Sequence, residues 1–181
     1  MKIAAIAGSL RKDSFNRKLL NNAVSFLDSH TVDVIDLKSL ALPVYDADVQ
    51  ASGFPENVAD FAIRIKNSDA LIIATPEYNH GIPGGLKNAI DWASRSPEKP
   101  LNNKTAFMMG ASTGGFGAIR GIYALRQTLL FFNILVLPQT VMVSFAEKAF
   151  DENGKLKDEK ILAQLEAGCQ ELIRVTQALK R

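Results

Sequence analysis

The chain has 181 residues, of which 47% are apolar and 22% charged, as in an ordinary soluble globular protein. That length fits one domain with a substantial core, so we expect a single domain over residues 1–181. A formal net charge of +2 is too small to indicate a nucleic-acid partner or a membrane surface. Because Cys169 is the only cysteine, no intrachain disulfide can form, which favours a cytoplasmic location.

Apolar runs alternate with helical patterns along the chain. The clearest strand, residues 69–75, is a continuous apolar run typical of a central parallel strand. Other strands are expected at residues 2–7, 31–37, 104–110 and 141–143. Helices are expected to begin near Phe15, Pro55, Pro83 and Ala118, with a last one carrying apolar residues from Ile161 to Leu179. Five strands alternating with five helices predict an α/β fold, an open doubly wound five-stranded parallel sheet with helices on both faces.

Three unusual loops follow the first, third and fourth expected strands, at residues 8–16, 76–83 and 111–117. The carboxyl ends of parallel strands lie at one edge of a sheet, and ligands bind there at the switch point of the strand order. We therefore expect the three loops to form one site. The longest irregular segment, residues 39–54, is either a functional flap or a long crossover.

The first loop has the features of an anion-binding turn. It joins a strand to a helix start, where free N–H groups and the helix dipole favour a phosphate. Ser9, Ser14 and Asn16 add side-chain donors, and Arg11 and Lys12 add positive charge. The alternative is an ordinary turn with polar caps. The loop is neither a Walker A loop nor the dinucleotide fingerprint, although Asp33 or Asp36 could imitate the acidic residue that binds a ribose.

The second loop combines two prolines with three glycines, which restrict the chain and let another group come close. The flat side chain of Tyr78 suits a planar heterocycle, whereas the alternative is a rigid structural turn. Glu77 is either a general base or a loop anchor. We interpret His80 as a solvated or anchoring residue rather than a ligand, and no metal site is predicted.

The third loop, residues 112–117, has almost no side-chain bulk, so its amides could reach the edge of a bound ring. A serine nucleophile is disfavoured because the Gly-x-Ser-x-Gly motif is missing and His30 and His80 are the only histidines. Cys169 falls on the apolar face of the last helix and is interpreted as core packing.

Together the loops resemble those of the NADPH-dependent FMN reductase family, in the flavodoxin-like superfamily that includes bacterial quinone, azo-dye and chromate reductases. The likeness runs from Met1 to the final helix. Its most specific part is the second loop joined to the following helix. The matching residues are Gly8-Ser9-Leu10-Arg11-Lys12-x-Ser14-x-Asn16, Thr75-Pro76-Glu77-Tyr78-Asn79 and Leu86-Lys87-Asn88-Ala89-Ile90-Asp91-Trp92.

The resemblance implies a flavodoxin-like fold with noncovalent FMN, and NADPH or NADH as co-substrate. It assigns three groups of residues to the cofactor. The phosphate is held by Ser9, Arg11, Ser14 and Asn16, and Phe15 beside them is a further cofactor-binding residue. The isoalloxazine ring lies against Pro76, Glu77, Tyr78 and Asn79, and its pyrimidine edge lies near Ser112, Gly114 and Gly115.

The resemblance also implies a homodimer or homotetramer. Two helices are candidates for subunit contacts, the one that carries Trp92 and the one that ends near Phe131 and Phe132. Core packing against the sheet is the alternative for both. Some relatives use arginine and tyrosine from the fourth helix in a polar network across a tetramer, and this chain offers Arg120, Tyr123 and Arg126.

The expected activity is a ping-pong cycle in which NAD(P)H passes a hydride to N5 of FMN and leaves. A quinone, flavin, azo or metal-oxyanion acceptor then takes its place. The organic chemistry belongs to the flavin, so no catalytic side chain is assigned. One alternative is an electron carrier without NAD(P)H oxidation, which the charge of +2 disfavours because small flavodoxins are usually strongly acidic. The other is a non-flavin binding module for a nucleotide or sugar phosphate.

Overall fold

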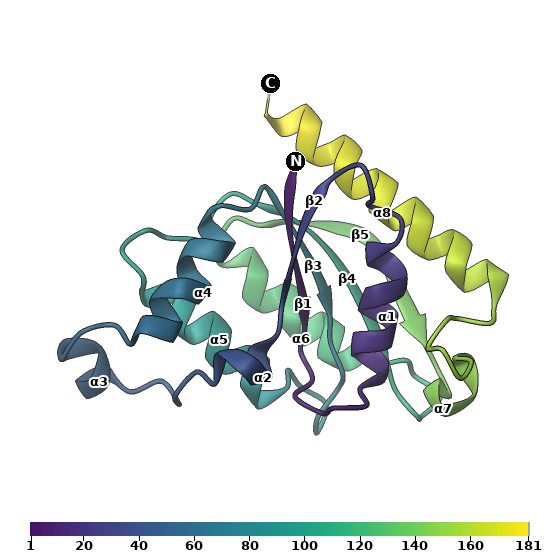
Figure 1. The fold of residues 1–181 in the computed structure, drawn as a ribbon, viewed down its shortest axis with the longest axis horizontal. Helices are drawn as coiled ribbons and strands as arrows, with labels where there is room; N and C mark the ends of the chain where they lie inside the picture. Colours follow the sequence, from purple (N-terminus) through teal and green to yellow (C-terminus); the bar gives the residue numbers. More distant parts are fainter. Residues whose placement is uncertain (181) are drawn as a thin grey trace.

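The computed structural model describes residues 1–180, which form one five-stranded sheet with helices on both faces (Figure 1). The strands are β1 (Lys2–Ala7), β2 (Thr31–Ile35), β3 (Ala70–Ala74), β4 (Thr105–Ala111) and β5 (Leu135–Val143). All neighbouring pairs are parallel, in the order β2-β1-β3-β4-β5. The predicted α/β, doubly wound sheet is confirmed, and its switch point lies between β1 and β3.

Five long helices and three short ones occur within residues 1–180. The long helices are α1 (Phe15–Val24), α4 (Glu56–Lys66), α5 (Gly84–Arg95), α6 (Ile119–Leu130) and α8 (Glu159–Leu179). The short helices, which the sequence did not predict, are α2 (Leu37–Leu40), α3 (Ala47–Ala51) and α7 (Ala146–Ala149). Four or five residues are too few to show a helical period.

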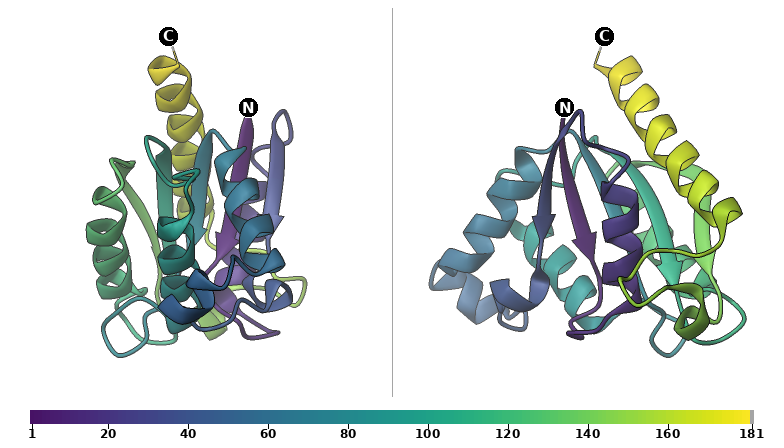
Figure 2. Two further views of the ribbon diagram at one scale, coloured as in Figure 1. Left: turned by 90° about the vertical axis from the view of Figure 1, so that its left-hand side faces the viewer. Right: turned by 45° about the vertical axis from the view of Figure 1, so that its right-hand side comes forward.

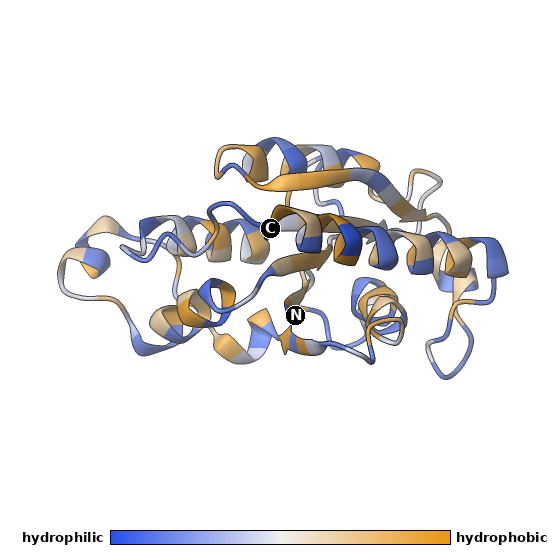
Figure 3. Cartoon of the chain, turned by 90° about the horizontal axis from the view of Figure 1, so that it is seen from above, coloured by the Kyte–Doolittle hydropathy of each residue, from blue (hydrophilic) through white to orange (hydrophobic). Residues whose placement is uncertain are grey.

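The sheet separates two apolar cores. Helices α1 and α8 cover one face, where Leu19 and Cys169 are fully buried, and α4, α5 and α6 cover the other (Figure 2). Viewed from above, the strands in the middle of the sheet are mostly hydrophobic, and the helices mix both kinds of residue (Figure 3). Burial raises the pKa of the Cys169 thiol to about 12, which agrees with the predicted packing role. No helix within residues 1–180 combines the length and hydrophobicity needed to cross a membrane.

Strand β5 differs most from its expected position, because it begins at Leu135 rather than near residue 141. Its pairing with β4 is interrupted by a register shift opposite the Ala106–Met108 region. The strand also contains Pro138, which edge strands tolerate. Arg126 stabilises this irregular stretch by donating hydrogen bonds to the carbonyls of Val136 and Leu137.

The segment of residues 42–54 is a crossover fixed to α5 by hydrogen bonds. The Asn88 side chain donates to the Pro43 carbonyl and accepts from the Tyr45 N–H. The indole N–H of Trp92, one helical turn later, donates to the same carbonyl, and the indole ring meets Tyr45 and Phe54 edge-on. Trp92 is completely buried within its own chain. Trp92 itself therefore has the packing role that was the alternative, whereas a subunit contact elsewhere on α5 stays a prediction.

Candidate functional site

The loops after β1, β3 and β4 meet at one edge of the sheet and enclose an open cleft of about 150 Å³. The chain therefore brings its three predicted loops together. Nine of the predicted site residues line the cleft: Ser9, Arg11, Ser14, Phe15, Asn16, Pro76, Glu77, Tyr78 and Ser112. Asn79, Gly114 and Gly115 do not line it, whereas Ala111 and Thr113, which sequence reasoning missed, do.

The first loop contributes two buried serines and several unpaired backbone donors beside the cleft. Ser14 is buried and caps α1, where its Oγ accepts a hydrogen bond from the Arg17 N–H. Ser9 is also buried, and its Oγ accepts from the Arg11 N–H. Within residues 1–180, the N–H groups of residues 12–16 donate to no protein acceptor. Free N–H groups at a helix start, beside a cationic side chain, suit a phosphate.

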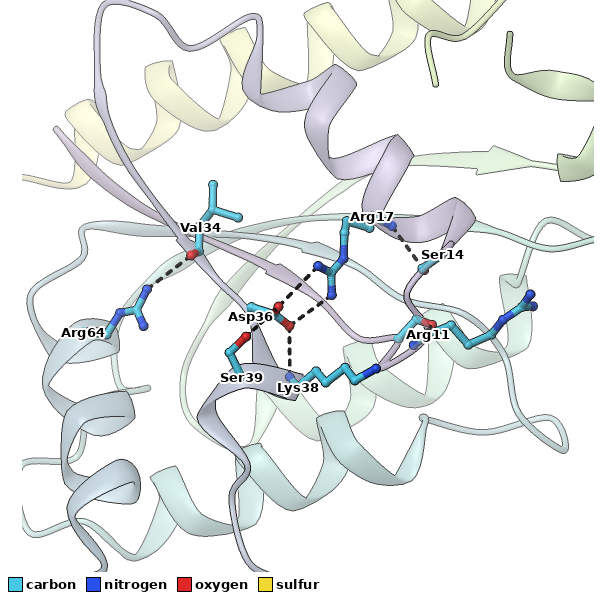
Figure 4. A network of polar contacts seen from close by, with 9 residues as sticks. Arg11, Ser14, Arg17, Val34, Asp36, Lys38, Ser39 and Arg64 are labelled. Atoms are coloured by element: carbon cyan, nitrogen blue, oxygen red, sulfur yellow. Dashed lines mark hydrogen bonds and ion pairs between the residues drawn. The ribbon is translucent and has the colours of Figure 1, made fainter. Parts of the chain in front are cut away.

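Neither aspartate near the end of β2 is available for a ribose. Figure 4 shows Asp36 enclosed by donors: both terminal nitrogens of Arg17, the N–H of Lys38 and the Ser39 hydroxyl. Partial burial alone would raise the pKa of the Asp36 carboxyl, but these donors together lower it. Asp33 is paired with Arg64, and hydrogen bonds from that guanidinium are the main cause of its lowered pKa.

The tip of the second loop is a tight turn. The N–H of Tyr78 donates to the Gly81 carbonyl at 3.2 Å, and the Gly81 N–H donates back at 3.0 Å. Asn79 and His80 between them have φ values of 49° and 65°, the pattern of a type I′ turn. Asparagine tolerates this left-handed conformation, whereas histidine is strained in it. His80 is exposed, in agreement with its predicted solvated position.

Glu77 anchors the second loop to the start of α6. Its Oε2 accepts from the N–H groups of Arg120 at 2.9 Å and Gly121 at 3.3 Å, and its Oε1 accepts from Arg120 Nε at 2.8 Å. The close approach requires glycine, because a Cβ at Gly121 would lie 2.9 Å from the Pro76 carbonyl oxygen. A carboxylate at a helix N-terminus is stabilised electrostatically. Of the two roles considered for Glu77, the contacts are those of a loop anchor.

The third loop is held by hydrogen bonds from the residues at the start of α7. Three of its carbonyls, those of Ser112, Gly114 and Gly115, accept hydrogen bonds from residues 144–146. In a trans peptide the C=O and the following N–H point in opposite directions. The N–H groups of Thr113, Gly115 and Phe116 therefore point away from residues 144–146 and remain available to a ligand.

Three residues of α6 are the candidates for a polar network between subunits, and each of them has a different environment in this chain. Arg120 pairs with Glu77 and lies over the Phe116 ring, with its guanidinium carbon 4.8 Å from the ring centroid. Arg126 is bound to carbonyls of β5. Tyr123 lies on the outer face of α6 and is 61% exposed.

Comparison with known proteins identifies the family to which this chain belongs. Residues 1–148 match the family described as NADPH-dependent FMN reductase. The chain belongs to the NADPH-dependent FMN reductase family. The predicted family, enzyme class and FMN cofactor are thereby confirmed.

Individual members are similar over nearly their whole length. An NAD(P)H-dependent FMN reductase of Pseudomonas aeruginosa is 45% identical over 162 residues, 88% of this chain and 86% of its own. A quinone reductase of Escherichia coli is 38% identical over 169 residues, 91% and 89% of the two chains. Among solved structures, the flavoenzyme NAD(P)H:(acceptor) oxidoreductase FerB of Paracoccus denitrificans superposes with a TM-score of 0.86 and 32% identity, covering 98% and 97%.

Strain at the tip of the second loop predicts the effect of His80→Gly. Glycine adopts the left-handed conformation without a Cβ clash, so we expect the unfolding free energy of the protein to rise by about 0.5–1 kcal/mol. Urea denaturation measures the change. Asn79→Gly is the matched control and is expected to gain less, because asparagine already tolerates this backbone. A His80→Gly variant no more stable than the parent would contradict the assigned strain.

Proposed function

We propose that this FMN reductase family member oxidises NAD(P)H with FMN held in the cleft, and reduces a small-molecule acceptor. A quinone is the favoured acceptor class, since the Escherichia coli relative is named a quinone reductase. Free flavin, azo compounds and metal oxyanions are the other acceptors that an open flavin site could admit. The observation that carries the proposal is the cleft itself, where the family's characteristic residues from three separate loops meet.

The donors of the cleft fit the two ends of FMN. The free N–H groups of residues 12–16, with Ser9, Ser14 and Arg11, match a dianionic phosphate. Pro76 and Tyr78 supply a flat, partly exposed wall for the ring, while the amides of the third loop suit its polar edge. The cleft is open to solvent, and Tyr78 in its wall is 48% exposed. One side of the ring would therefore be accessible to a second molecule.

The protein's part in the reaction is to position and to bind. FMN, when bound, supplies the hydride chemistry between NAD(P)H and the acceptor. Because the cleft has one open side, the two substrates would use it in turn, which gives a ping-pong order. We assign no general acid or base. Glu77, the carboxylate that lines the cleft, is held by three N–H donors and serves as an anchor.

The redox function predicts a transient-kinetic signature. When the FMN-loaded protein is mixed anaerobically with NADPH in a stopped-flow instrument, we expect rapid bleaching of the visible flavin absorption. A second mixing step with a quinone should restore the absorption. Bleaching by dithionite without bleaching by NADPH or NADH would instead indicate an electron carrier.

The phosphate cradle predicts the effect of Arg11→Ala. A charge-assisted phosphate contact contributes about 1.5–3 kcal/mol, so the Kd for FMN should rise by one to two orders of magnitude. Fluorescence titration of the apoprotein measures it. Riboflavin, which lacks the phosphate, should bind the variant and the parent equally. Lys12→Ala is the matched control, because Lys12 is exposed but does not line the cleft. An unchanged FMN affinity in the Arg11→Ala variant would show that Arg11 does not bind the phosphate.

We further propose that residues 1–181 act as one FMN-binding domain, because the described chain builds a single sheet and its two cores. A cytoplasmic location is also proposed, on the grounds that the only cysteine in the sequence is buried and forms no disulfide and that NAD(P)H is available there. Separation of cytoplasmic from envelope fractions, followed by immunodetection, tests the location.

A homodimer or homotetramer is proposed as the working form. Its support is an apolar area at the outer face and end of α6, where large side chains are left in water. Tyr123 is 61%, Leu130 56% and Phe131 83% exposed. A second copy of the chain that covers this area would remove these side chains from solvent.

Phe131→Asp tests that subunit contact. A charge in an apolar interface should convert the oligomer to a monomer of 19.7 kDa, as measured by sedimentation velocity. Val44→Asp is the matched control, because Val44 is also 83% exposed but lies in the crossover segment. The Val44→Asp variant should sediment as the parent protein does. A parent protein that already sediments as a monomer would disprove the proposal.

A further inference from the structure

The end of β4 extends past its neighbour β3. Strand β3 pairs with β4 as far as Ala74 and Met109, and the Thr75 N–H donates to the Met109 carbonyl at 2.9 Å. Proline 76 then carries the chain away from the sheet. On the other side, β5 continues alongside, and the Ser112 N–H still donates to the Val143 carbonyl. The backbone of Ala111 thus faces a place where the sheet has no strand.

The side chain of Asn16 occupies that place. Its Nδ2 donates to the Ala111 carbonyl at 2.9 Å, and its Oδ1 accepts from the Ala111 N–H at 2.9 Å. Only one orientation of the amide makes both bonds. Asn16 is 3% exposed, and Ala111 is 2% exposed. Since buried backbone groups need partners, this pair satisfies both polar groups of Ala111.

A carboxamide offers the same donor and acceptor as a peptide group, so Asn16 substitutes for the missing residue of β3. The two hydrogen bonds between Asn16 and Ala111 lie in the cleft, which Asn16, Ala111 and Ser112 all line. They link the first loop to the third across the gap that the departure of β3 opens. The loop that carries the available N–H groups of Thr113, Gly115 and Phe116 begins directly after the tethered residue.

We propose that Asn16 is a positioning residue for the flavin ring, which it serves by fixing the end of β4 and the amides that follow it. This proposal rests on the proposed FMN site. It differs from the phosphate contact that the sequence resemblance implied for Asn16, because the amide's one acceptor and one of its two N–H donors are already used on Ala111. Ser9, Ser14, Arg11 and the free N–H groups remain for the phosphate.

The two roles predict different losses of affinity. A phosphate contact affects FMN but not riboflavin, which carries the same ring without a phosphate. A residue that positions the ring-binding amides affects both flavins alike. The ratio of the two dissociation constants therefore separates the roles, and Arg11→Ala, which should affect FMN alone, is the reference variant.

Asn16→Asp is the informative substitution. Near pH 8 the introduced carboxylate can accept from the Ala111 N–H but repels the Ala111 carbonyl. We expect the affinities for FMN and riboflavin to fall together, by about ten- to hundredfold. Burial and the facing carbonyl raise the pKa of the introduced carboxyl. Near pH 5 the protonated acid can donate to that carbonyl, and riboflavin affinity should return to within about threefold of the parent.

The parent protein, titrated at both pH values, is the control for other ionising groups. The charged residues that line the cleft are Arg11 and Glu77, the latter paired with Arg120, and Tyr78 also lines it. Urea denaturation of each protein at each pH separates a local effect from general unfolding. A Kd increase confined to FMN, or a riboflavin affinity that does not recover at low pH, overturns the proposal. A parent that binds no flavin refutes the proposed function instead.

If Asn16→Asp does not fold, hydrogen exchange of the parent protein tests whether Asn16 fixes the end of β4, on which the proposal depends. Ala111 lies beyond the pairing of β3, so without the Asn16 bond its N–H would exchange like that of the exposed Thr113. With that bond it should exchange as slowly as the N–H of Met109, in the apoprotein and in the FMN-loaded protein. Fast exchange of Ala111 overturns the proposal.

Discussion

The architecture of the cleft depends on the point where β3 leaves the sheet. Pairing between β3 and β4 ends at Ala74 and Met109, and Pro76 turns the chain outward. Because β1 also ends there, three loops surround a gap in the middle of the carboxyl edge rather than at its side. A doubly wound sheet offers such an opening only at its switch point. The position of one proline after one apolar strand thus determines where a ligand can enter the fold.

The walls of the gap are held by contacts from distant parts of the chain. Glu77 binds the start of α6, residues 144–146 bind the carbonyls of the third loop, and Arg17 with Asp36 braces the helix behind the first loop. Each wall is therefore held in shape by contacts within the chain itself. Preorganisation of this kind reduces the conformational entropy lost on binding. It also explains why a loop so rich in glycine can form a defined surface.

Sequence reasoning located the sheet and the cleft because their signals are local. A buried parallel strand is a continuous apolar run, and the order of strands and helices places every loop at a known edge. What it missed depends on residues far apart in sequence. Glu77 meets Arg120 after 43 residues, and Asn16 meets Ala111 after 95. Trp92 is covered by a crossover that carries no strong pattern of its own. The early start of β5 was hidden by Pro138 and the register shift beside it.

The packing of the crossover on α5 has a spectroscopic consequence. The chain contains one tryptophan, so all indole emission comes from Trp92. That indole is shielded from water by Tyr45 and Phe54, and its N–H is bound to Pro43. Water would reach the indole if residues 42–54 lifted from the helix. A red shift in the fluorescence of the protein, with its secondary structure unchanged, would accordingly report the detachment of this segment.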